Sequence, residues 1–325
     1  MRTILSQYQD WIELEVKKQK YGREPVSLYE PIRYLMGLGG KRLRPMLTLL
    51  SYALFKNDVR QIVKYAVAVE TFHNFTLMHD DIMDKAPLRR GMATVHEKWN
   101  SNTAIMAGDV MLVKVYDMFL NIAPEKFKPV LSAFNKCAAE VCEGQQWDME
   151  FEKEKTVTEV QYIKMIRSKT AVLLGFSLEL GAILADAPER DCIALRQFGT
   201  NIGIGFQLMD DLLDAYADPK KFGKQVGGDI IANKKTFLLI KAIEKATGRQ
   251  GAELSRWLSE EKFKKQDKVR AVKALYDSLG IPLLAEKKVN HYFKKGFDNL
   301  ALLSCSADAQ EPLIHFTKSL IARQS

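Results

Sequence analysis

Residues 61–84 read QIVKYAVAVETFHNFTLMHDDIMD, a largely apolar stretch that ends in a run of aspartates. Its apolar residues recur three and four positions apart and no proline interrupts them, a pattern typical of an α-helix. The predicted helix finishes with three carboxylates, at Asp80, Asp81 and Asp84. Asp80 and Asp84 are one turn apart and therefore face the same way. Because three carboxylates this close repel one another, the stretch predicts a bound cation.

The same periodicity continues through most of the chain. No stretch shows the strict alternation of apolar and polar residues that is typical of strands, and short glycine or proline breaks separate the segments. We therefore predict an all-α protein of roughly ten or more helices that form a single domain over residues 1–325. Further helices are expected at Met46–Phe55, Ala104–Ile122, Val130–Glu152, Thr158–Ala185, Asp191–Ala217 and Ile230–Ala246.

Composition narrows the class of protein only in part. Lys and Arg number 48 against 40 Asp and Glu, an excess of +8 that suits nucleic acid, an anionic membrane or an anionic small substrate. No uncharged apolar run approaches the roughly 18 residues of a membrane span, and the first 20 residues lack an apolar signal core. The four cysteines form no C-x-x-C pair, so we expect reduced thiols and a cytoplasmic location.

A second acidic run repeats the pattern of the first. Asp210-Asp211-Leu212-Leu213-Asp214 closes another apolar helix, and Gln207 shares a stripe with Asp210 and Asp214. Two such runs suggest two walls of one metal site. Ligands that offer only oxygen favour hard cations, magnesium above all, and neither run carries a cysteine for a softer metal. A di-iron bundle is not favoured either, because it needs two Glu-x-x-His pairs and the sequence holds one, at Glu70 and His73.

Basic motifs accompany both acidic runs. In Gly39-Gly40-Lys41-Arg42-Leu43-Arg44-Pro45, Lys41 and Arg44 could bind a phosphate and the glycines let the backbone approach it. Leu88-Arg89-Arg90-Gly91 follows the first acidic run. Lys169-Thr170 lies in an apolar segment where an ammonium group needs a partner. Lys224 and Lys234 come soon after the second acidic run, and His73 lies about two helical turns before Asp80.

Each motif also has a plainer interpretation. An acidic run can be a solvated helix end, adjacent arginines can simply neutralise carboxylates, and a histidine in an apolar helix is usually part of the core. Negative charge at a helix C-terminus opposes the helix dipole, however. Two matching acidic runs with basic companions therefore favour a site for a metal-bound diphosphate.

In this order, from about Gly39 to Thr236, the motifs resemble the trans-isoprenyl diphosphate synthase family of farnesyl, geranylgeranyl and polyprenyl diphosphate synthases. The resemblance implies an antiparallel helical bundle of the isoprenoid synthase type around a deep central cavity, assembled as a homodimer. It also implies a prenyltransferase that condenses isopentenyl diphosphate with an allylic diphosphate (dimethylallyl, geranyl or farnesyl). Three magnesium ions are expected with the allylic diphosphate.

The resemblance also assigns roles to the residues that match the family's motifs. Asp80 and Asp84, supported by Asp81, correspond to one magnesium wall, and Asp210 with Asp211 and Asp214 to the other. The remaining roles fall on two groups of polar side chains. The allylic diphosphate would contact Arg89, Lys169, Thr170, Gln207, Lys224 and Lys234, and the isopentenyl diphosphate would contact Lys41, Arg44, His73 and Arg90.

The residues four and five positions before the first aspartate help to set product length in the family. Here they are Thr76 and Phe75. A bulky Phe75 disfavours a long chain, and Thr76 is smaller than the aromatic residue of some farnesyl synthases. We therefore expect a C20 or C15 all-trans product, with a longer polyprenyl product as the alternative.

Three other functions fit the sequence less well. A terpene cyclase uses D-D-x-x-D but needs no second diphosphate pocket such as Lys41 and Arg44 suggest. A non-catalytic synthase subunit tends to lose aspartates from the first run, and here all are present. A nucleic-acid binder fits the +8 charge but not the acidic runs, which repel phosphate unless metals intervene.

Overall fold

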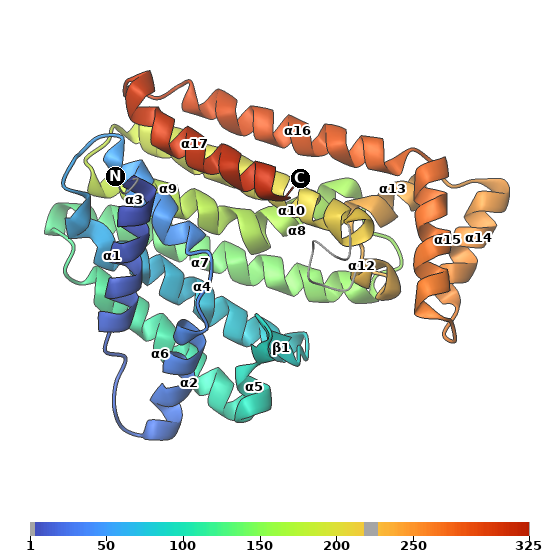
Figure 1. Cartoon of the computed structure of the whole chain (residues 1–325), viewed down its shortest axis with the longest axis horizontal. Helices are drawn as coiled ribbons and strands as arrows, with labels where there is room; N and C mark the ends of the chain where they lie inside the picture. Colours follow the sequence, from blue (N-terminus) through green and yellow to red (C-terminus); the bar gives the residue numbers. More distant parts are fainter. Residues whose placement is uncertain (1–3, 218–226, 325) are drawn as a thin grey trace. The chain divides into compact units, whose positions relative to one another are not determined.

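The computed structural model describes residues 4–217 and 227–324, and helices dominate them (Figure 1). The prediction of an all-α fold is confirmed. The chain divides into two compact units, each built from three segments. Unit 1 comprises Met1–Cys137, Leu173–Arg196 and Leu302–Phe316, and unit 2 comprises Ala138–Val172, Gln197–Ala301 and Thr317–Ser325. A single domain over the whole chain stays a prediction, as does the central cavity.

The first elements in chain order all belong to unit 1. They are α1 (Ile4–Lys18), α2 (Val26–Gly37), α3 (Leu43–Ala53), the 3-10 turn η1 (Val59–Ile62), α4 (Val63–Met83), β1 (Leu88–Arg89), β2 (Met92–Ala93), α5 (Val95–Lys98) and α6 (Ser101–Phe119).

The later elements include three long helices that pass from one unit into the other. They are α7 (Pro124–Lys153), α8 (Glu159–Ile166), the π-helical turn η2 (Arg167–Ala171), α9 (Val172–Leu184), α10 (Glu189–Tyr216), α12 (Gly228–Ile231), α13 (Phe237–Lys245), α14 (Gly248–Ser259), α15 (Lys265–Ser278), α16 (Ile281–Leu300) and α17 (Ala307–Gln324).

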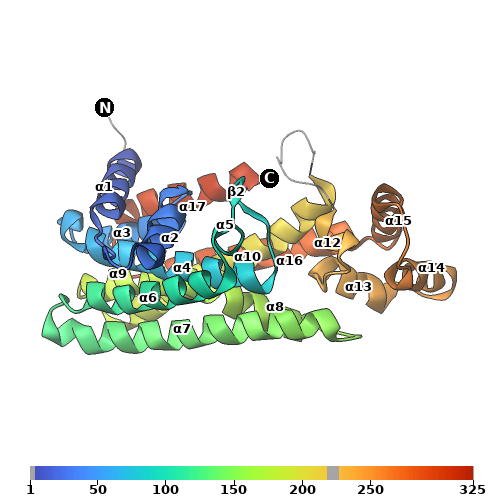
Figure 2. The same cartoon turned by 90° about the horizontal axis from the view of Figure 1, so that it is seen from below.

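Helix α4 forms the centre of unit 1. It runs beside α6 and also packs against α3 and α1 (Figures 1 and 2). Most of its residues from Val63 to Met78 are buried, which explains why the sequence is apolar on nearly every face. Gly108 of α6 allows the close approach, because a side-chain carbon there would lie 2.2 Å from the ring of His79. This packing fixes the C-terminal end of α4, where the aspartates lie.

In unit 2, α15 packs against α12, α13, α14 and α16. The predicted helix Ile230–Ala246 is wrong in its middle, because α12 ends at Ile231 and α13 begins only at Phe237. Asn233 adopts a left-handed backbone (φ 54°), and the Thr236 hydroxyl accepts the Leu239 amide as the N-cap of α13. Residues Asn233 to Thr236 of the break are all polar, so the apolar periodicity on either side belongs to two separate helices.

Two further expectations need correction. The predicted helix Thr158–Ala185 contains the π-helical turn η2, which inserts a wider turn between α8 and α9. A short antiparallel hairpin, β1–β2, follows the first aspartate run, although no alternation predicted strands there. Strands of two residues are too short to show a period.

Among the described residues, no helix combines the length and the apolarity that crossing a membrane requires.

Candidate active site

The first aspartate run forms the last turn of α4. Asp84 caps the helix, and its amide donates to the carbonyl oxygen of Asp80 at 2.8 Å. Asp84 is exposed and Asp80 is half-buried, whereas Asp81 is only 2% exposed. Asp80 and Asp84 therefore present their carboxylates to a ligand more readily than Asp81 does.

Asp81 instead holds Arg89 from the hairpin. Arg89 Nε donates to both carboxylate oxygens at 2.9 and 2.8 Å, and Nη2 donates to Oδ1 at 2.6 Å. Burial alone would lower the pKa of Arg89, but the hydrogen bonds and charge of Asp81 outweigh it and raise the pKa. The Arg89 Nη2 also lies 3.9 Å from Asp80 Oδ2. Asp81 thus fixes a permanent cation beside the Asp80 carboxylate.

The two arginines of the hairpin have different partners, because Arg89 contacts Asp81 and Arg90 contacts Gly39. Arg90 and Gly91 form the connecting turn, both with positive φ (55° and 77°), as a type I′ turn requires. An arginine rarely adopts this conformation, so Arg90 holds local backbone strain. Its Nη1 donates to the carbonyl oxygen of Gly39. A side-chain carbon at Gly40 would lie 2.9 Å from the Arg90 guanidinium, so only glycine fits there without a shift.

Positive charge in unit 1 is concentrated near His73. Burial lowers the pKa of Arg44 to about 10, and its buried Nε has no hydrogen-bond acceptor among the described residues. The pKa of His73 is lowered well below 6.5, first by burial and then by the charges of Arg44 and Arg90. Arg89 and Arg42 make smaller contributions. Lys41 is exposed. An anion would relieve this excess of positive charge and supply the acceptor that Arg44 lacks.

Phe75 and Thr76 lie on α4 between His73 and the aspartates. Phe75 is buried and packs its ring against Phe72 and His79, with centroids 5.6 and 4.8 Å apart. The Thr76 hydroxyl donates to the carbonyl oxygen of His73 at 2.8 Å. Phe75 therefore belongs to an aromatic cluster of unit 1, whether or not it also limits product length.

The second aspartate run lies at the end of α10, in unit 2. Asp210 is exposed, while Asp211 is 4% exposed and accepts hydrogen bonds from Tyr162 Oη and, at 3.4 Å, from Gln207 Nε2. Burial, the largest influence, raises the pKa of Asp211 to about 7. Asp214 Oδ2 accepts the amide of Asp229 at 3.0 Å. Asp210 is thus the most accessible ligand of the three, and Tyr162 is a partner that sequence reasoning missed.

Lys169 and Thr170 come from the π-helical turn η2. Lys169 Nζ pairs with Asp148 Oδ2 of α7 at 2.6 Å, and the Thr170 hydroxyl donates to Gln207 Oε1 at 3.4 Å. Asp148 therefore answers the expectation that Lys169 needs a partner. Sequence reasoning missed Asp148, because it lies 21 positions from Lys169 on another helix.

Lys234 follows α12 and is exposed. Its amide donates to the carbonyl oxygen of Asp229 at 2.9 Å, and its charge opposes the effect of burial that raises the pKa of Asp229. A buried lysine supports this segment: Lys268 Nζ donates to Asn233 Oδ1 at 2.7 Å. Lys224 lies outside the described residues, and its role stays a prediction.

The donor set fits magnesium when substrate phosphates complete the coordination. Among the described residues, no three histidine, cysteine, aspartate or glutamate side chains gather into a metal cage. Magnesium is usually held by one or two carboxylates together with water and phosphate oxygens. Asp80 and Asp84 in unit 1, and Asp210 in unit 2, offer such oxygens. That both runs hold one diphosphate stays a prediction.

Comparison with known proteins agrees with this chemistry. The polyprenyl synthetase profile matches residues 25–276. A geranylgeranyl pyrophosphate synthase of Geoglobus acetivorans is 37% identical over 303 residues, which cover 93% of this chain and 92% of that protein. A crystal structure of a geranylgeranyl pyrophosphate synthase has a TM-score of 0.94 and 41% identity, with full coverage of both chains.

A more distant structure carries ligands. It is a polyprenyl synthase from Caulobacter crescentus complexed with calcium and isoprenyl diphosphate, with 25% identity, a TM-score of 0.86 and coverage of 99% of this chain and 96% of that one.

The all-α fold, the two acidic runs and these matches lead to one conclusion. The chain belongs to the polyprenyl synthetase family and is a prenyltransferase. Enzymes of this family depend in general on magnesium.

Proposed function

We propose that this enzyme condenses isopentenyl diphosphate with an allylic diphosphate and releases a short all-trans prenyl diphosphate. One observation carries the assignment of two diphosphates. In unit 1, the Arg89 guanidinium lies beside the Asp80 carboxylate, whereas the Arg90 guanidinium donates to the carbonyl oxygen of Gly39. The two adjacent arginines therefore lie in different chemical surroundings. One surrounding combines carboxylates with Arg89, whereas in the other Arg44 and Arg90 lie near His73 and the nearby Glu70 carboxylate is paired with Arg42.

The cationic surrounding suits a diphosphate that arrives without metal. Lys41, Arg44 and Arg90 would bind the charged oxygens of isopentenyl diphosphate. His73 is neutral at pH 7, because its pKa is lowered, so it acts as a hydrogen-bond partner and not as a further charge. The Nε donor of Arg44, which has no acceptor within the described part of the chain, supports this role.

The carboxylates suit a diphosphate that arrives with magnesium. Asp80 and Asp84 would hold metal in unit 1, with Asp81 supporting Arg89, and Asp210 would do so in unit 2, with Asp211 and Asp214. Bound magnesium, for which we propose three ions, would neutralise the allylic diphosphate and make it a better leaving group. Arg89, Lys169, Lys224 and Lys234 would contact its oxygens, with Thr170 and Gln207 as uncharged partners.

In the reaction, the C–O bond of the allylic diphosphate breaks and leaves an allylic cation and inorganic diphosphate. The double bond of isopentenyl diphosphate attacks the cation to form the new C–C bond. A proton then leaves the condensed product, and the released diphosphate accepts it. The cationic side chains stabilise the negative charge that develops on the leaving group.

We propose geranylgeranyl diphosphate (C20) as the main product and farnesyl diphosphate (C15) as the alternative. The buried Phe75 and the names of two of the similar synthases support this choice. The test is to incubate radiolabelled isopentenyl diphosphate and magnesium with a dimethylallyl, geranyl or farnesyl primer and to size the products by chromatography. Condensation with none of the primers would refute the proposal, and products longer than C20 would refute the assigned length.

We also propose a homodimer that works in the cytoplasm. Met106 and Val113 of α6 and Leu120, the C-cap of that helix, follow one another at intervals of seven positions and are 55%, 57% and 66% exposed. Large apolar side chains in a row on one helix face favour a second copy of the chain as partner. Val113→Glu should convert a dimer to a monomer in analytical ultracentrifugation, and a wild-type monomer would refute the dimer. The four free cysteines support a reducing compartment.

A further inference from the structure

Arg42 differs from its basic neighbours, because its side chain is buried. The residue is 2% exposed, while Lys41 is exposed and Arg44 is half-buried. Arg42 is also the residue before α3 and has a left-handed backbone, with φ 46° and ψ 39°. Both the burial of a guanidinium and this conformation are unfavourable unless the surroundings compensate. Arg42 must therefore be held by strong local contacts.

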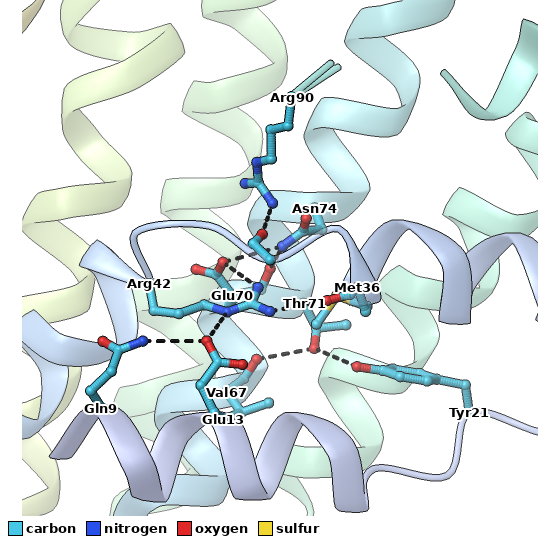
Figure 3. A network of polar contacts seen from close by, with 11 residues as sticks. Gln9, Glu13, Tyr21, Met36, Arg42, Val67, Glu70, Thr71, Asn74 and Arg90 are labelled. Atoms are coloured by element: carbon cyan, nitrogen blue, oxygen red, sulfur yellow. Dashed lines mark hydrogen bonds and ion pairs between the residues drawn. The ribbon is translucent and has the colours of Figure 1, made fainter. Parts of the chain in front are cut away.

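Three nitrogens of the guanidinium contact three different helices (Figure 3). Nε donates to Glu13 Oε1 of α1, Nη1 to Glu70 Oε1 of α4, and Nη2 to the carbonyl oxygen of Met36 in α2, each at 3.0 Å. Only arginine presents donors in such a rigid planar fork. A lysine keeps the charge but cannot make all three contacts.

The acceptors are themselves held in place. Asn74 Nδ2 donates to the carbonyl oxygen of Glu70 at 2.8 Å and lies 3.4 Å from Glu70 Oε1, and Gln9 Nε2 donates to Glu13 Oε1 at 3.3 Å (Figure 3). Glu70 is also one helical turn from His73 on α4. The Arg42 contacts therefore tie the start of α3 to the part of α4 that carries His73.

The backbone on either side of Arg42 carries or contacts the arginines near His73, which are Arg44 and Arg90. Gly39 accepts a hydrogen bond from Arg90, and Gly40 lies against the Arg90 guanidinium. Arg44 follows two residues after Arg42, and its Nε finds no hydrogen-bond partner in the residues that the structure describes. A shift of the Arg42 backbone would therefore move Gly39, Gly40 and Arg44 relative to one another.

We propose that Arg42 is a positioning residue for isopentenyl diphosphate. It does not touch the substrate, but it fixes the loop that carries Lys41 and Arg44 and the glycine carbonyl that orients Arg90. The inference rests on the proposed function, because it requires the arginines near His73 to form the isopentenyl diphosphate pocket. Its consequence is selective: loss of the three-way contact weakens binding of isopentenyl diphosphate and not of the allylic diphosphate.

The test compares the Michaelis constants of both substrates in Arg42→Lys. We expect KM for isopentenyl diphosphate to rise by roughly tenfold, which corresponds to about 1.4 kcal/mol of binding. KM for the allylic substrate and kcat at saturating isopentenyl diphosphate should stay within about twofold of wild type. The variant loses binding energy that the bound substrate and the transition state share, so the chemical step is not slowed. Glu13→Gln is a milder second variant, which weakens one contact and should give a smaller rise.

Arg196→Lys is the matched control. Arg196 also lies in unit 1 and pairs with a glutamate, Glu179, at 2.8 Å, so the same substitution breaks a comparable ion pair away from the loop. Neither Michaelis constant should change in this control. An Arg42→Lys enzyme whose two Michaelis constants equal those of wild type, or rise together, would overturn the inference.

Separate variants distinguish this failure from a failure of the proposed function. If Arg44→Gln raises KM for isopentenyl diphosphate but neither Arg42→Lys nor Glu13→Gln does, the pocket stands and the positioning role falls. If Arg44→Gln leaves KM for isopentenyl diphosphate unchanged, the assignment of the pocket is refuted, and the positioning role of Arg42 is refuted together with it.

Discussion

A side-chain carbon placed on Gly144 of α7 would lie 2.1 Å from the amide nitrogen of Lys169 and 2.6 Å from its Cα. The two helical segments of unit 2 therefore meet backbone to backbone at the π-helical turn η2. This contact places Lys169 near Asp148, one turn further along α7, and completes their ion pair at 2.6 Å. The position of Lys169, which we propose to bind the allylic diphosphate, thus depends on Gly144, a residue without a side chain.

Gly144→Ala should misplace Lys169. Because a methyl group at this distance forces the backbones apart, we expect kcat/KM for the allylic substrate to fall by roughly 100-fold. Steady-state kinetics measure the effect. Gly37→Ala is the control, since a side-chain carbon there meets nothing within 4 Å. A Gly144→Ala enzyme with wild-type kinetics would show that the close approach does not matter for catalysis.

Asp80→Ala and Asp210→Ala should each reduce kcat by roughly 1000-fold, because each removes a proposed metal ligand from the stabilisation of the leaving group. The circular dichroism spectrum should stay that of a helical protein. Asp298→Ala serves as the control, because Asp298 is an exposed aspartate that pairs with Lys294, one turn away on the same helix. Normal turnover in either site variant would refute its role as a ligand.

His73 should make the folded protein less stable in mild acid. Its pKa in the folded state lies well below 6.5, so the unfolded chain takes up a proton near pH 6.5 while the folded protein does not. The free energy of unfolding should therefore decrease as pH falls below 6.5, by up to about 1.4 kcal/mol per pH unit from this residue. The decrease should stop only below the lowered pKa.

Urea unfolding at pH 7.5 and 5.5 measures this effect, with His73→Gln as the comparison. The variant should lose less stability between the two pH values than wild type does. Equal losses in both proteins would mean that burial and the neighbouring arginines do not keep His73 neutral.

Phe75→Ala should lengthen the product if Phe75 limits the growing chain. The substitution leaves a cavity beside Phe72 and His79, so we also expect a loss of stability of about 3–5 kcal/mol. Chromatography of the products at a temperature where the variant stays folded is the measurement. An unchanged product length would restrict Phe75 to its packing role.

Lys268→Met should loosen the segment that carries Lys234. Lys268 is 1% exposed, and its removal leaves the Asn233 side-chain oxygen without this donor. We expect about 1–3 kcal/mol of destabilisation together with a reduced kcat. Lys265→Met, at an exposed position of the same helix, should change neither quantity. A destabilised variant with unchanged kcat would confine Lys268 to stability.

The sequence predicted well what periodicity encodes. Helices α4 and α10 begin and end within about two residues of the expected Gln61–Asp84 and Asp191–Ala217. The residues chosen for chemistry lie mostly at exposed or half-buried positions at helix ends and turns. Both results follow from local patterns in the chain.

Features that the sequence did not reveal depend mostly on contacts between distant residues. Nothing in Lys41-Arg42-Leu43-Arg44 indicates that the second cation is buried, because Glu13 and Glu70, which bury it, lie far away in the sequence. The break at Asn233 depends in the same way on Lys268, 35 positions later. A π-helical turn adds one residue to a helix without changing its apolar character, so periodicity passes over it.

The β1–β2 hairpin has strands of two residues and a turn of two residues, so it cannot take up an extra residue without a change in strand pairing. One inserted residue would detach Arg89 from Asp81 and Arg90 from Gly39 at the same time. Natural variants that keep both substrates should therefore exchange side chains in this segment but conserve its length. A change in the length of this segment among relatives would mark an enzyme that has altered which molecules it accepts.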